Sequence, residues 1–270
     1  MITFPNCKIN LGLNVTRKRK DGYHDLETVF LPIGLKDSLE LIQSTEFKFQ
    51  TSGLQISGDE ESNLCVKAYR LLKEGFPELP PVHIHLHKAI PMGAGLGGGS
   101  ADTTFMLMML NKKFKLNIAE ARLLEYALSL GSDCPFFIIN KPSFARGRGE
   151  LLEPIALDLS SYKIVLVNSG IHVSTKEAFA QLIPKAPEVN IKEVVRQHVQ
   201  TWREEMHNDF EDGVFKLHPE LKRIKEELYN KGAIYAAMTG TGSTVYGFFE
   251  KDKAVNLNFP PNYLVAELPA

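Results

Sequence analysis

The chain has 270 residues, 44% of them hydrophobic and 23% charged, and a formal net charge of -1. This composition is typical of a globular protein and excludes a fibrous or disordered chain. A net charge near zero does not indicate the basic surface that nucleic-acid binding requires. The one basic run, residues 17–20, leads into an Asp-Gly pair that predicts a solvated hairpin tip. The length fits one large domain or two closely joined ones.

The compartment is predicted from three observations. The opening MITFPNCKINLGL lacks the plan of a signal peptide, and no stretch approaches the roughly 18 apolar residues of a membrane span. Cys7, Cys65 and Cys134 are scattered and form no CxxC pair. This pattern argues against a disulfide framework and a thiolate zinc site, and we expect a cytoplasmic protein.

The first third of the chain predicts a β-rich region followed by a helix and a strand. Residues 7–15 and 28–42 read as strands, and 46–57 has the alternation of a hairpin. A helix with Ser62 or Asn63 as its cap follows. In residues 82–87, apolar side chains alternate with three histidines, which predicts a strand with one imidazole face. Three histidines could bind a metal, but no carboxylate or Cys accompanies them, so a solvated face is favoured.

The remainder predicts mixed helices and strands. A helix with a Met-rich core face follows Ser100, and another runs to Leu130 with a start signal at Asn117 and Glu120. Residues 136–168 read as strand-rich, the region around Pro184 and 221–229 as helical, and the segment AIYAAMTGTGSTVYGFF as strand again. The fold class is therefore predicted as α+β, with the best domain boundary in RGRGELLEPIALD.

The most informative motif is PMGAGLGGGSA at residues 91–101, between a predicted strand and a predicted helix. Glycines allow positive φ and close approach of an anion to backbone amides at a helix start. A Walker A loop is excluded because no Lys precedes Ser100. The spacing of Gly93, Gly95 and Gly98 matches a dinucleotide fingerprint, but the acidic residue at the right distance, Glu120, lies in a helical pattern. A phosphate site of another kind is favoured.

Two polar residues in apolar surroundings are candidates for chemistry. Lys8 and Asn10 share one face of an otherwise apolar strand, so both need partners. Asp133, between a helix end and an apolar run, reads as a cap or turn residue or as a partner of Lys8. A nearby cation would keep such a carboxylate ionised and able to accept a proton. Sequence spacing does not show whether the two side chains meet.

Three further segments have both a structural and a functional interpretation. Tyr23 and His24 follow a glycine turn and serve either packing or recognition of a ring. A second glycine cluster, at residues 240–247, reads as a turn or as part of a site. The polar patch NDFE at residues 208–211 has no independent physical explanation in the sequence.

Together these segments resemble the GHMP kinase superfamily over nearly the whole chain, from Lys8 to Phe249. PMGAGLGGGSAD is similar to the family's phosphate loop, and MTGTGSTVYGFF to the third family motif, which packs beside that loop. Four further segments resemble the 4-diphosphocytidyl-2-C-methyl-D-erythritol kinase branch of the superfamily: KINLGL, DGYHDLETVF, GSDCPFF and NDFE. One departure is Asn6-Cys7, where the branch usually has Pro-Ala.

The resemblance implies a role for each matching residue. It implies that Asp133 is the base that activates the acceptor hydroxyl and that Lys8 is its electrostatic partner. The other expected substrate contacts are Asn10 at the methylerythritol end, Tyr23 stacking on the cytosine, His24 hydrogen bonding to it, Phe179 as the second stacking aromatic, and Thr175 and Phe30 in the same pocket. The expected ATP contacts are Asn63 and Lys88 near the adenine and, along the loop, Pro91, Met92, Gly93, Ala94, Gly95, Leu96, Gly97, Gly98, Gly99, Ser100 and Ala101, with Ser100 also beside the metal.

The resemblance also implies an architecture and an activity. We expect a β-rich ATP-binding and catalytic domain at 1–152 and a GHMP-type α/β sandwich domain at 153–270, whose last strand could return to the first, with the active site in the cleft between them. We expect an ATP- and Mg²⁺-dependent kinase that phosphorylates the 2-hydroxyl of 4-diphosphocytidyl-2-C-methyl-D-erythritol in the non-mevalonate (MEP) route to isoprenoid precursors. It would bind neither nucleic acid nor membrane and would be a monomer or weak homodimer. The alternatives are a homoserine, mevalonate or sugar kinase and a non-catalytic nucleotide-binding member.

Overall fold

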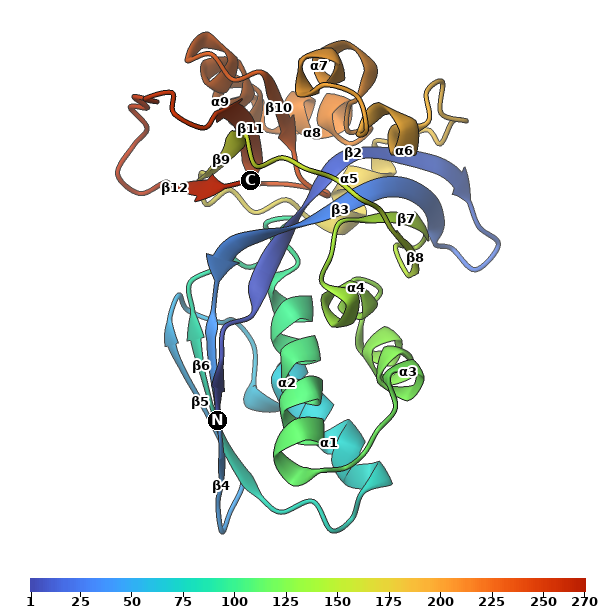
Figure 1. Ribbon diagram of the computed structural model, residues 1–270, viewed down its shortest axis with the longest axis vertical. Helices are drawn as coiled ribbons and strands as arrows, with labels where there is room; N and C mark the ends of the chain where they lie inside the picture. The colour runs from blue at the N-terminus through green and yellow to red at the C-terminus, as the bar shows by residue number, and fades with distance from the viewer. The chain divides into compact units, whose positions relative to one another are not determined.

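The computed structural model describes all 270 residues, which form two compact units whose segments alternate along the chain (Figure 1). The first unit contains residues 1–7, 35–92 and 97–140, and the second contains residues 8–34, 93–96 and 141–270. The chain therefore passes between the units inside the glycine loop. The predicted division at residue 152 stays a prediction, since the compact units do not follow a single cut of the chain.

The first unit is built on a four-stranded sheet with the order β1 (Ile2–Thr3), β4 (Ser38–Gln43), β6 (Val82–Lys88), β5 (Lys48–Gly53). β6 pairs antiparallel with β4 and parallel with β5. Its apolar side chains are buried, whereas His83, His85 and His87 lie on the opposite face, where they are less buried and bond to side chains of β5. The predicted imidazole face is confirmed, and no group of His, Cys, Asp or Glu suited to a metal ion occurs there or elsewhere.

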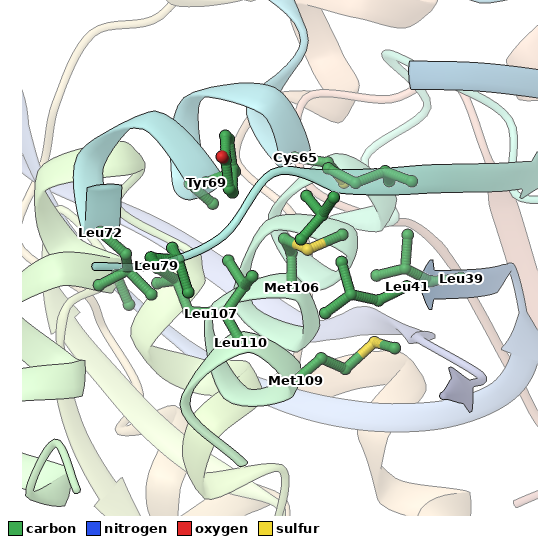
Figure 2. Close-up of a cluster of buried hydrophobic side chains, with 14 of the residues drawn as sticks. Leu39, Leu41, Cys65, Tyr69, Leu72, Leu79, Met106, Leu107, Met109 and Leu110 are labelled. Carbon is green, nitrogen blue, oxygen red and sulfur yellow. The ribbon is translucent and has the colours of Figure 1, made fainter. Parts of the chain in front are cut away.

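The helices of the first unit gather on one face of this sheet in Figure 1. They are η1 (Glu60–Ser62), α1 (Leu64–Gly75), α2 (Gly98–Phe114), α3 (Glu120–Leu130) and α4 (Cys134–Ile139). Figure 2 shows the core between α1, α2 and β4, into which Met106 and Met109 project, so the Met-rich face is a core face as predicted. Asn63 caps α1 through a 2.9 Å bond from Cys65 N to its Oδ1, which confirms the predicted helix start.

The second unit contains two four-stranded sheets. One has the order β2 (Asn6–Lys18), β3 (His24–Lys36), β7 (Ser143–Gly147), β8 (Leu151–Pro154), and a turn at residues 19–22 joins its first two strands. The other has the order β10 (Tyr235–Met238), β11 (Val245–Glu250), β9 (Tyr162–Asn168), β12 (Leu264–Pro269), with all neighbours antiparallel. Because β12 pairs with β9, the last strand stays in the second unit.

Helices cover the second sheet of this unit. They are α5 (Thr175–Ala180), α6 (Ile191–Val194), η2 (Val199–Thr201), α7 (Trp202–Glu205), α8 (Glu211–Leu217) and α9 (Pro219–Asn230). Apolar side chains of α8 and α9 pack with Val245 and Phe249 of β11. Trp202 packs edge-on against Phe248, which alternates with these residues and so faces the other side of the sheet. No helix of the chain has the length and hydrophobicity that a membrane crossing requires.

The prediction that residues 136–168 are strand-rich is confirmed from residue 143 onward and wrong at its start. The run CPFFII forms α4, with Pro135 in its first turn and Phe136 and Phe137 fully buried. A short apolar run has no periodicity that separates a strand from a buried helix, and Pro in the first helical turn loses no hydrogen bond. The strands that follow are β7, β8 and β9.

Three smaller predictions are wrong in whole or in part. Residues 46–57 do not form a hairpin, because β5 pairs in parallel with β6. The strand predicted at 28–42 is interrupted at Asp37, whose buried carboxylate accepts hydrogen bonds from Ala89 N and Ile90 N. Asn117 does not cap α3: it has a φ of 56°, and the N-cap residue is Ala119. These differences depend on tertiary partners that local patterns do not encode.

Candidate active site

The glycine loop has the backbone geometry that an anion site requires. Gly93, Gly95 and Gly97 have φ values of 61°, 75° and 67°, which side-chain-bearing residues rarely adopt. Gly97 is the N-cap of α2 and offers no side-chain hydrogen bond, so no side chain competes for the amides of the first turn. The positive end of the helix dipole lies at the same place, which favours a phosphate.

The second glycine cluster packs beside this loop. Thr239 Oγ1 donates to Gly95 O at 3.0 Å, and Thr244 N donates to Ala94 O at 3.2 Å. A Cβ on Gly95 would lie 2.0 Å from the Thr239 carbonyl oxygen, and a Cβ on Gly240 would lie 3.2 Å from Gly95 Cα. Only glycine permits this approach, and the expected packing of the third motif against the loop is confirmed.

The NDFE segment, unexplained in the sequence, supports the second glycine cluster. Asn208 Nδ2 donates to Met238 O and Gly240 O, both at 2.8 Å. Glu211 Oε1 accepts from Met238 N at 2.7 Å, and its Oε2 accepts from Lys225 Nζ at 2.6 Å. These side chains satisfy backbone groups of a turn that contacts the phosphate loop, and so they fix the position of that turn.

Lys8 and Asn10 lie on one face of β2, as predicted, and their side chains bond to each other. Each is 3% exposed. Lys8 Nζ donates to Asn10 Oδ1 at 2.7 Å and to Gly95 O at 3.1 Å. Asn10 Nδ2 donates to Thr28 Oγ1 at 3.1 Å, and Thr239 Oγ1 lies 3.2 Å from Asn10 Oδ1. The amide of Asn10 therefore holds the Lys8 ammonium against the phosphate loop.

Asp133 lies in the first unit as the residue before α4, with helical φ and ψ of -82° and -13°. Its neighbour Cys134 bonds to Ser100 in the first turn of α2. A Cβ on Gly131 would lie 3.9 Å from Ser100 Oγ. The segment 131–134 thus packs on the phosphate end of α2, which brings Asp133 close to that end. Lys8 belongs to the second unit, and its meeting with Asp133 stays a prediction.

A cavity of about 180 Å³ lies in the first unit between α1, β6 and the start of α2. Asn63 and Lys88, both expected near an adenine, contribute to its wall. Its lining is mostly apolar with a few polar groups, a pattern typical of a site for a flat base. The lining residues are Ile56, Ser57, Ser62, Asn63, Leu64, Cys65, Leu86, Lys88, Met92, Gly99 and Asp102.

Lys88 is held between two carboxylates. Its ammonium is 2% exposed and pairs with Asp37 and, at 2.7 Å, with Asp102. Burial opposes the charge of Lys88, but the charges of Asp102 and Asp37 outweigh burial and raise its pKa. Burial is the main cause that raises the pKa of Asp102 to about 7, and Asp37 adds to it, while Lys88 opposes it. Asp102 Oδ1 makes no hydrogen bond. The group joins β6 to the second turn of α2 and so supports the helix that carries the phosphate site.

The aromatic residues expected at a cytosine lie in the second unit. His24 and Phe179 stack with ring centroids 4.6 Å apart and 21° between planes, and Phe210 contacts Phe179 edge-on. Tyr23 is 55% exposed. Burial, and to a smaller extent the charge of Lys18, lowers the pKa of His24. A neutral imidazole at pH 7 offers one donor and one acceptor, as pairing with a pyrimidine edge requires.

The remaining predicted residues lie in the same unit. Phe30 is 2% exposed, with Lys8 Nζ 4.9 Å above its ring centre. Thr175 is the exposed first residue of α5, which also carries Phe179. No role was predicted for Thr239, although its position directly before Gly240 of the second glycine cluster was a usable signal. His172 was not predicted either, and its Nδ1 would lie 3.3 Å from a Cβ on Gly93. Nothing in the local sequence marked His172.

The cysteines are buried and free of disulfides. Burial raises the pKa of the Cys65 thiol, and it raises the pKa of the Cys134 thiol to about 11. Both thiols therefore stay protonated at neutral pH and act as small core side chains rather than nucleophiles.

Known proteins match this chain in sequence and in fold. The sequence model of the GHMP kinases N terminal domain matches residues 63–141, and that of the GHMP kinases C terminal domain matches residues 190–257. A Bacteroides fragilis protein named 4-diphosphocytidyl-2-C-methyl-D-erythritol kinase is 54% identical over 259 residues, 94% of each chain. A crystal structure of 4-(cytidine 5'-diphospho)-2C-methyl-D-erythritol kinase is 28% identical, covers 100% of both chains and superposes with a TM-score of 0.82. The mevalonate kinase of Methanococcus jannaschii shares the fold at 15% identity, with a TM-score of 0.69 over 94% of this chain and 92% of its own.

The two family domains, the phosphate loop and the third motif that packs beside it all agree with these matches. The chain is a two-domain enzyme with mixed helices and sheets that uses ATP as a phosphoryl donor. It belongs to the GHMP kinase family.

Proposed function

We propose that this kinase transfers the γ-phosphate of ATP to the 2-hydroxyl of 4-diphosphocytidyl-2-C-methyl-D-erythritol, a step of the MEP route to isoprenoid precursors. The observation that carries the proposal is the buried Lys8 ammonium, held by Asn10 and placed 3.1 Å from Gly95 O of the phosphate loop. The names of relatives about half identical over 94% of the chain support the same substrate.

ATP binds in the first unit in this proposal. The adenine occupies the cavity bounded by Asn63, Lys88 and Met92, and the phosphates lie along residues 93–101 against the amides at the start of α2. Gly99 lines the cavity and belongs to the loop, so the base and phosphate sites are continuous. Lys88 acts here through its carboxylate partners, since its ammonium already pairs with both.

Magnesium fits the residues present. Mg²⁺ takes few protein ligands in kinases and binds mainly to substrate phosphates and water, so a lone hydroxyl at the phosphate end of a helix suits it. Ser100 Oγ, in the first turn of α2 and beside the 131–134 segment, is the group that would hold it together with the ATP phosphates. When bound, the ion would neutralise charge on the phosphates.

The chain's own residues position the reactants and move one proton. The 2-hydroxyl gives its proton to the Asp133 carboxylate, its oxygen forms a bond to the γ-phosphorus, and the bond from that phosphorus to the departing ADP oxygen breaks. Lys8 stabilises negative charge on the attacking oxygen. Loop amides stabilise charge on the transferring group. Phosphoryl transfer requires little more than this positioning and charge stabilisation.

The acceptor binds through the second unit. Tyr23 stacks on the cytosine and the neutral His24 pairs with its edge, while Thr175 and Phe30 line the pocket. His24 stacks on one face of the Phe179 ring. A cytosine bound between Tyr23 and Phe179 therefore stacks on the other face of Phe179 or displaces His24. Asn10 contributes by fixing Lys8 at the methylerythritol end.

The proposal extends to domain roles and surroundings. Residues 1–152 carry ATP binding and catalysis, and residues 153–270 contribute to the acceptor pocket. We expect the reaction in the cytoplasm, with a small molecule as the only substrate besides ATP, without nucleic acid or membrane, and with the enzyme as a monomer or weak homodimer.

Single-turnover transfer from ATP labelled at the γ-phosphate tests the function. Purified enzyme in excess over ATP is mixed with 4-diphosphocytidyl-2-C-methyl-D-erythritol, homoserine, mevalonate or a hexose, and labelled product is counted. We expect transfer to the cytidine substrate alone. Preferential transfer to another acceptor would replace the substrate assignment, and ATP binding without transfer to any acceptor would favour a non-catalytic nucleotide-binding protein.

A further inference from the structure

A guanidinium covers the one exposed aromatic ring of the acceptor side. Arg148, in the turn between β7 and β8, places its guanidinium carbon 4.9 Å from the centre of the Tyr23 ring. This distance is within the range of a cation–π contact. Gly147 at the end of β7 pairs with Leu26 near the start of β3. Arg148 comes next in the chain, so its turn lies beside the start of β3.

The turn that carries Arg148 is built to hold one shape. Gly147 and Gly149 have φ values of 70° and 107°. Arg148 N donates to Glu150 Oε2 at 2.5 Å, and Arg148 Nε lies 3.7 Å from Glu150 Oε1. A Cβ on Gly147 would lie 2.8 Å from the same carboxylate. The side chain of Arg148 is 30% exposed, so Glu150 and the ring together confine it.

The backbone around Tyr23 is fixed as well. Tyr23 N donates to Asp21 Oδ1 at 3.1 Å, and Arg19 N donates to Tyr23 O at 2.8 Å. The ring itself is on a hairpin tip beside Gly22, which has a φ of 87°. An exposed tyrosine on a fixed backbone still samples several side-chain rotamers, and ordering such a side chain on binding costs about 0.5–1.5 kcal/mol.

We propose that Arg148 is a positioning residue that holds the Tyr23 ring on one face so that the other face receives the cytosine of the acceptor. The inference rests on the proposed function. Arg148 acts through the ring rather than as an anchor for the substrate diphosphate, because its charge already lies beside Glu150 and its planar group lies over Tyr23. The three-layer stack of guanidinium, phenol and base uses both faces of the phenol.

A double-mutant cycle tests this role in the full-length enzyme. KM and kcat for the cytidine substrate and KM for ATP are measured for wild type, Arg148→Met, Tyr23→Ala and the double variant. We expect Arg148→Met to raise KM for the cytidine substrate roughly fivefold, the size of a cation–π contact, without changing kcat or KM for ATP. In the Tyr23→Ala background the same change is expected to have no further effect. Arg148→Lys should restore part of the loss, since an ammonium also binds a ring face.

Two results would overturn the inference. Additive effects of the two changes would mean that Arg148 contacts the substrate independently of Tyr23, and an unchanged KM in Arg148→Met would mean that it has no role. Arg146→Met is the matched control: it removes the same charge two residues earlier, where the side chain is exposed and lies over Phe144, and should leave KM unchanged.

A wrong substrate assignment can be distinguished from a wrong role for Arg148. If wild type does not phosphorylate the cytidine substrate, the function is wrong, and calorimetry of CDP binding to the same four proteins then tests Arg148 alone. A loss of CDP affinity in Arg148→Met that disappears in the Tyr23→Ala background supports the positioning role. Equal CDP affinity in all four proteins, or no CDP binding to wild type, contradicts it.

Discussion

The donor side and the acceptor side of this kinase are built in different ways. The wall of the cavity in the first unit is made by core elements, and its charged residues Lys88 and Asp102 are 2% and 3% exposed. The residues expected at the cytosine are Tyr23 in a turn, His24 at the start of β3 and Phe179 on the short helix α5 of the second unit, and Tyr23 is 55% exposed. The cavity wall therefore shares its residues with the hydrophobic core, whereas the Tyr23 ring expected at the cytosine lies at the surface.

This difference predicts how the two sides respond to mutation. A buried charge that loses its partner destabilises the fold, so donor-side changes should affect stability and ATP use together. An exposed ring contributes little to folding, so acceptor-side changes should affect recognition alone. Loops that carry recognition on a stable scaffold can vary without loss of the fold, which fits a family whose members act on different acceptors.

The largest expected effect comes from Asp133→Asn, which separates chemistry from binding on both sides. Losing the proton acceptor should lower kcat by about 10²–10⁴-fold. The Kd for ATP should change little, since Asp133 lies outside the cavity lining. Rapid-quench kinetics and calorimetry measure the two quantities, with the exposed Asp158→Asn as control. Near-normal turnover would show that Asp133 is not the base, and a weaker Kd for ATP would show that donor binding and chemistry are not separable.

Lys88→Met should be the strongest test of the buried donor side. It leaves Asp37 and Asp102 buried without their cation, and breaking such a group typically costs about 3–5 kcal/mol of unfolding free energy. Urea denaturation measures the loss, and KM for ATP should rise in parallel. Lys112→Met, at the exposed end of α2, removes the same charge and should change neither quantity. Unchanged stability in Lys88→Met would contradict the contrast between the two sides.

Tyr23→Ala is the corresponding test of the acceptor side. A base that stacks on an aromatic ring gains about 1–3 kcal/mol, so KM for the cytidine substrate should rise roughly tenfold or more. The urea midpoint and KM for ATP should stay at their wild-type values, because the ring is exposed. Equal increases in both KM values would remove the cytosine role from Tyr23.

The smallest expected effect is a change in the pH dependence of stability. Asp102 has a pKa of about 7 in the folded protein, against 3.8 as the ordinary value, so the native state binds more protons than the unfolded state between those pH values. Unfolding free energy should therefore fall as pH rises from 5 to 7, by on the order of 1 kcal/mol from this group. Asp102→Asn should flatten this part of the profile in urea titrations. An identical slope in the variant would mean that Asp102 does not titrate there.

Local patterns predicted most of the elements of the first unit. The cap at Asn63, the alternating strand that became β6 and the Met-rich helix α2 follow from periodicity and capping, which act over a few residues. The errors lie where a distant partner decides the conformation: CPFFII became a helix against α2, and residues 48–53 paired in parallel with β6. No local signal specifies a parallel partner more than thirty residues away.

The features of the candidate site can likewise be separated into those that the sequence determines and those that depend on the tertiary structure. The sequence determined by itself which residue types are present: the glycines that allow positive φ, a lysine and an asparagine on one strand face, and an aromatic beside a turn. These choices depend on backbone sterics and side-chain alternation, which are properties of neighbours in the chain.

Only the tertiary structure decided which of these groups touch. It joined Lys8 to Asn10 and to Gly95, supported the loop through Thr239 and Asn208, and placed Arg148 over the Tyr23 ring. Apart from the contact between Lys8 and Asn10, these contacts link residues that are 87 or more positions apart or that belong to separate motifs. They form because the packing of sheets and helices brings distant side chains together. A buried polar group needs a hydrogen-bond partner. The sequence shows which polar groups lie in apolar surroundings, but it does not show which partner each of them has.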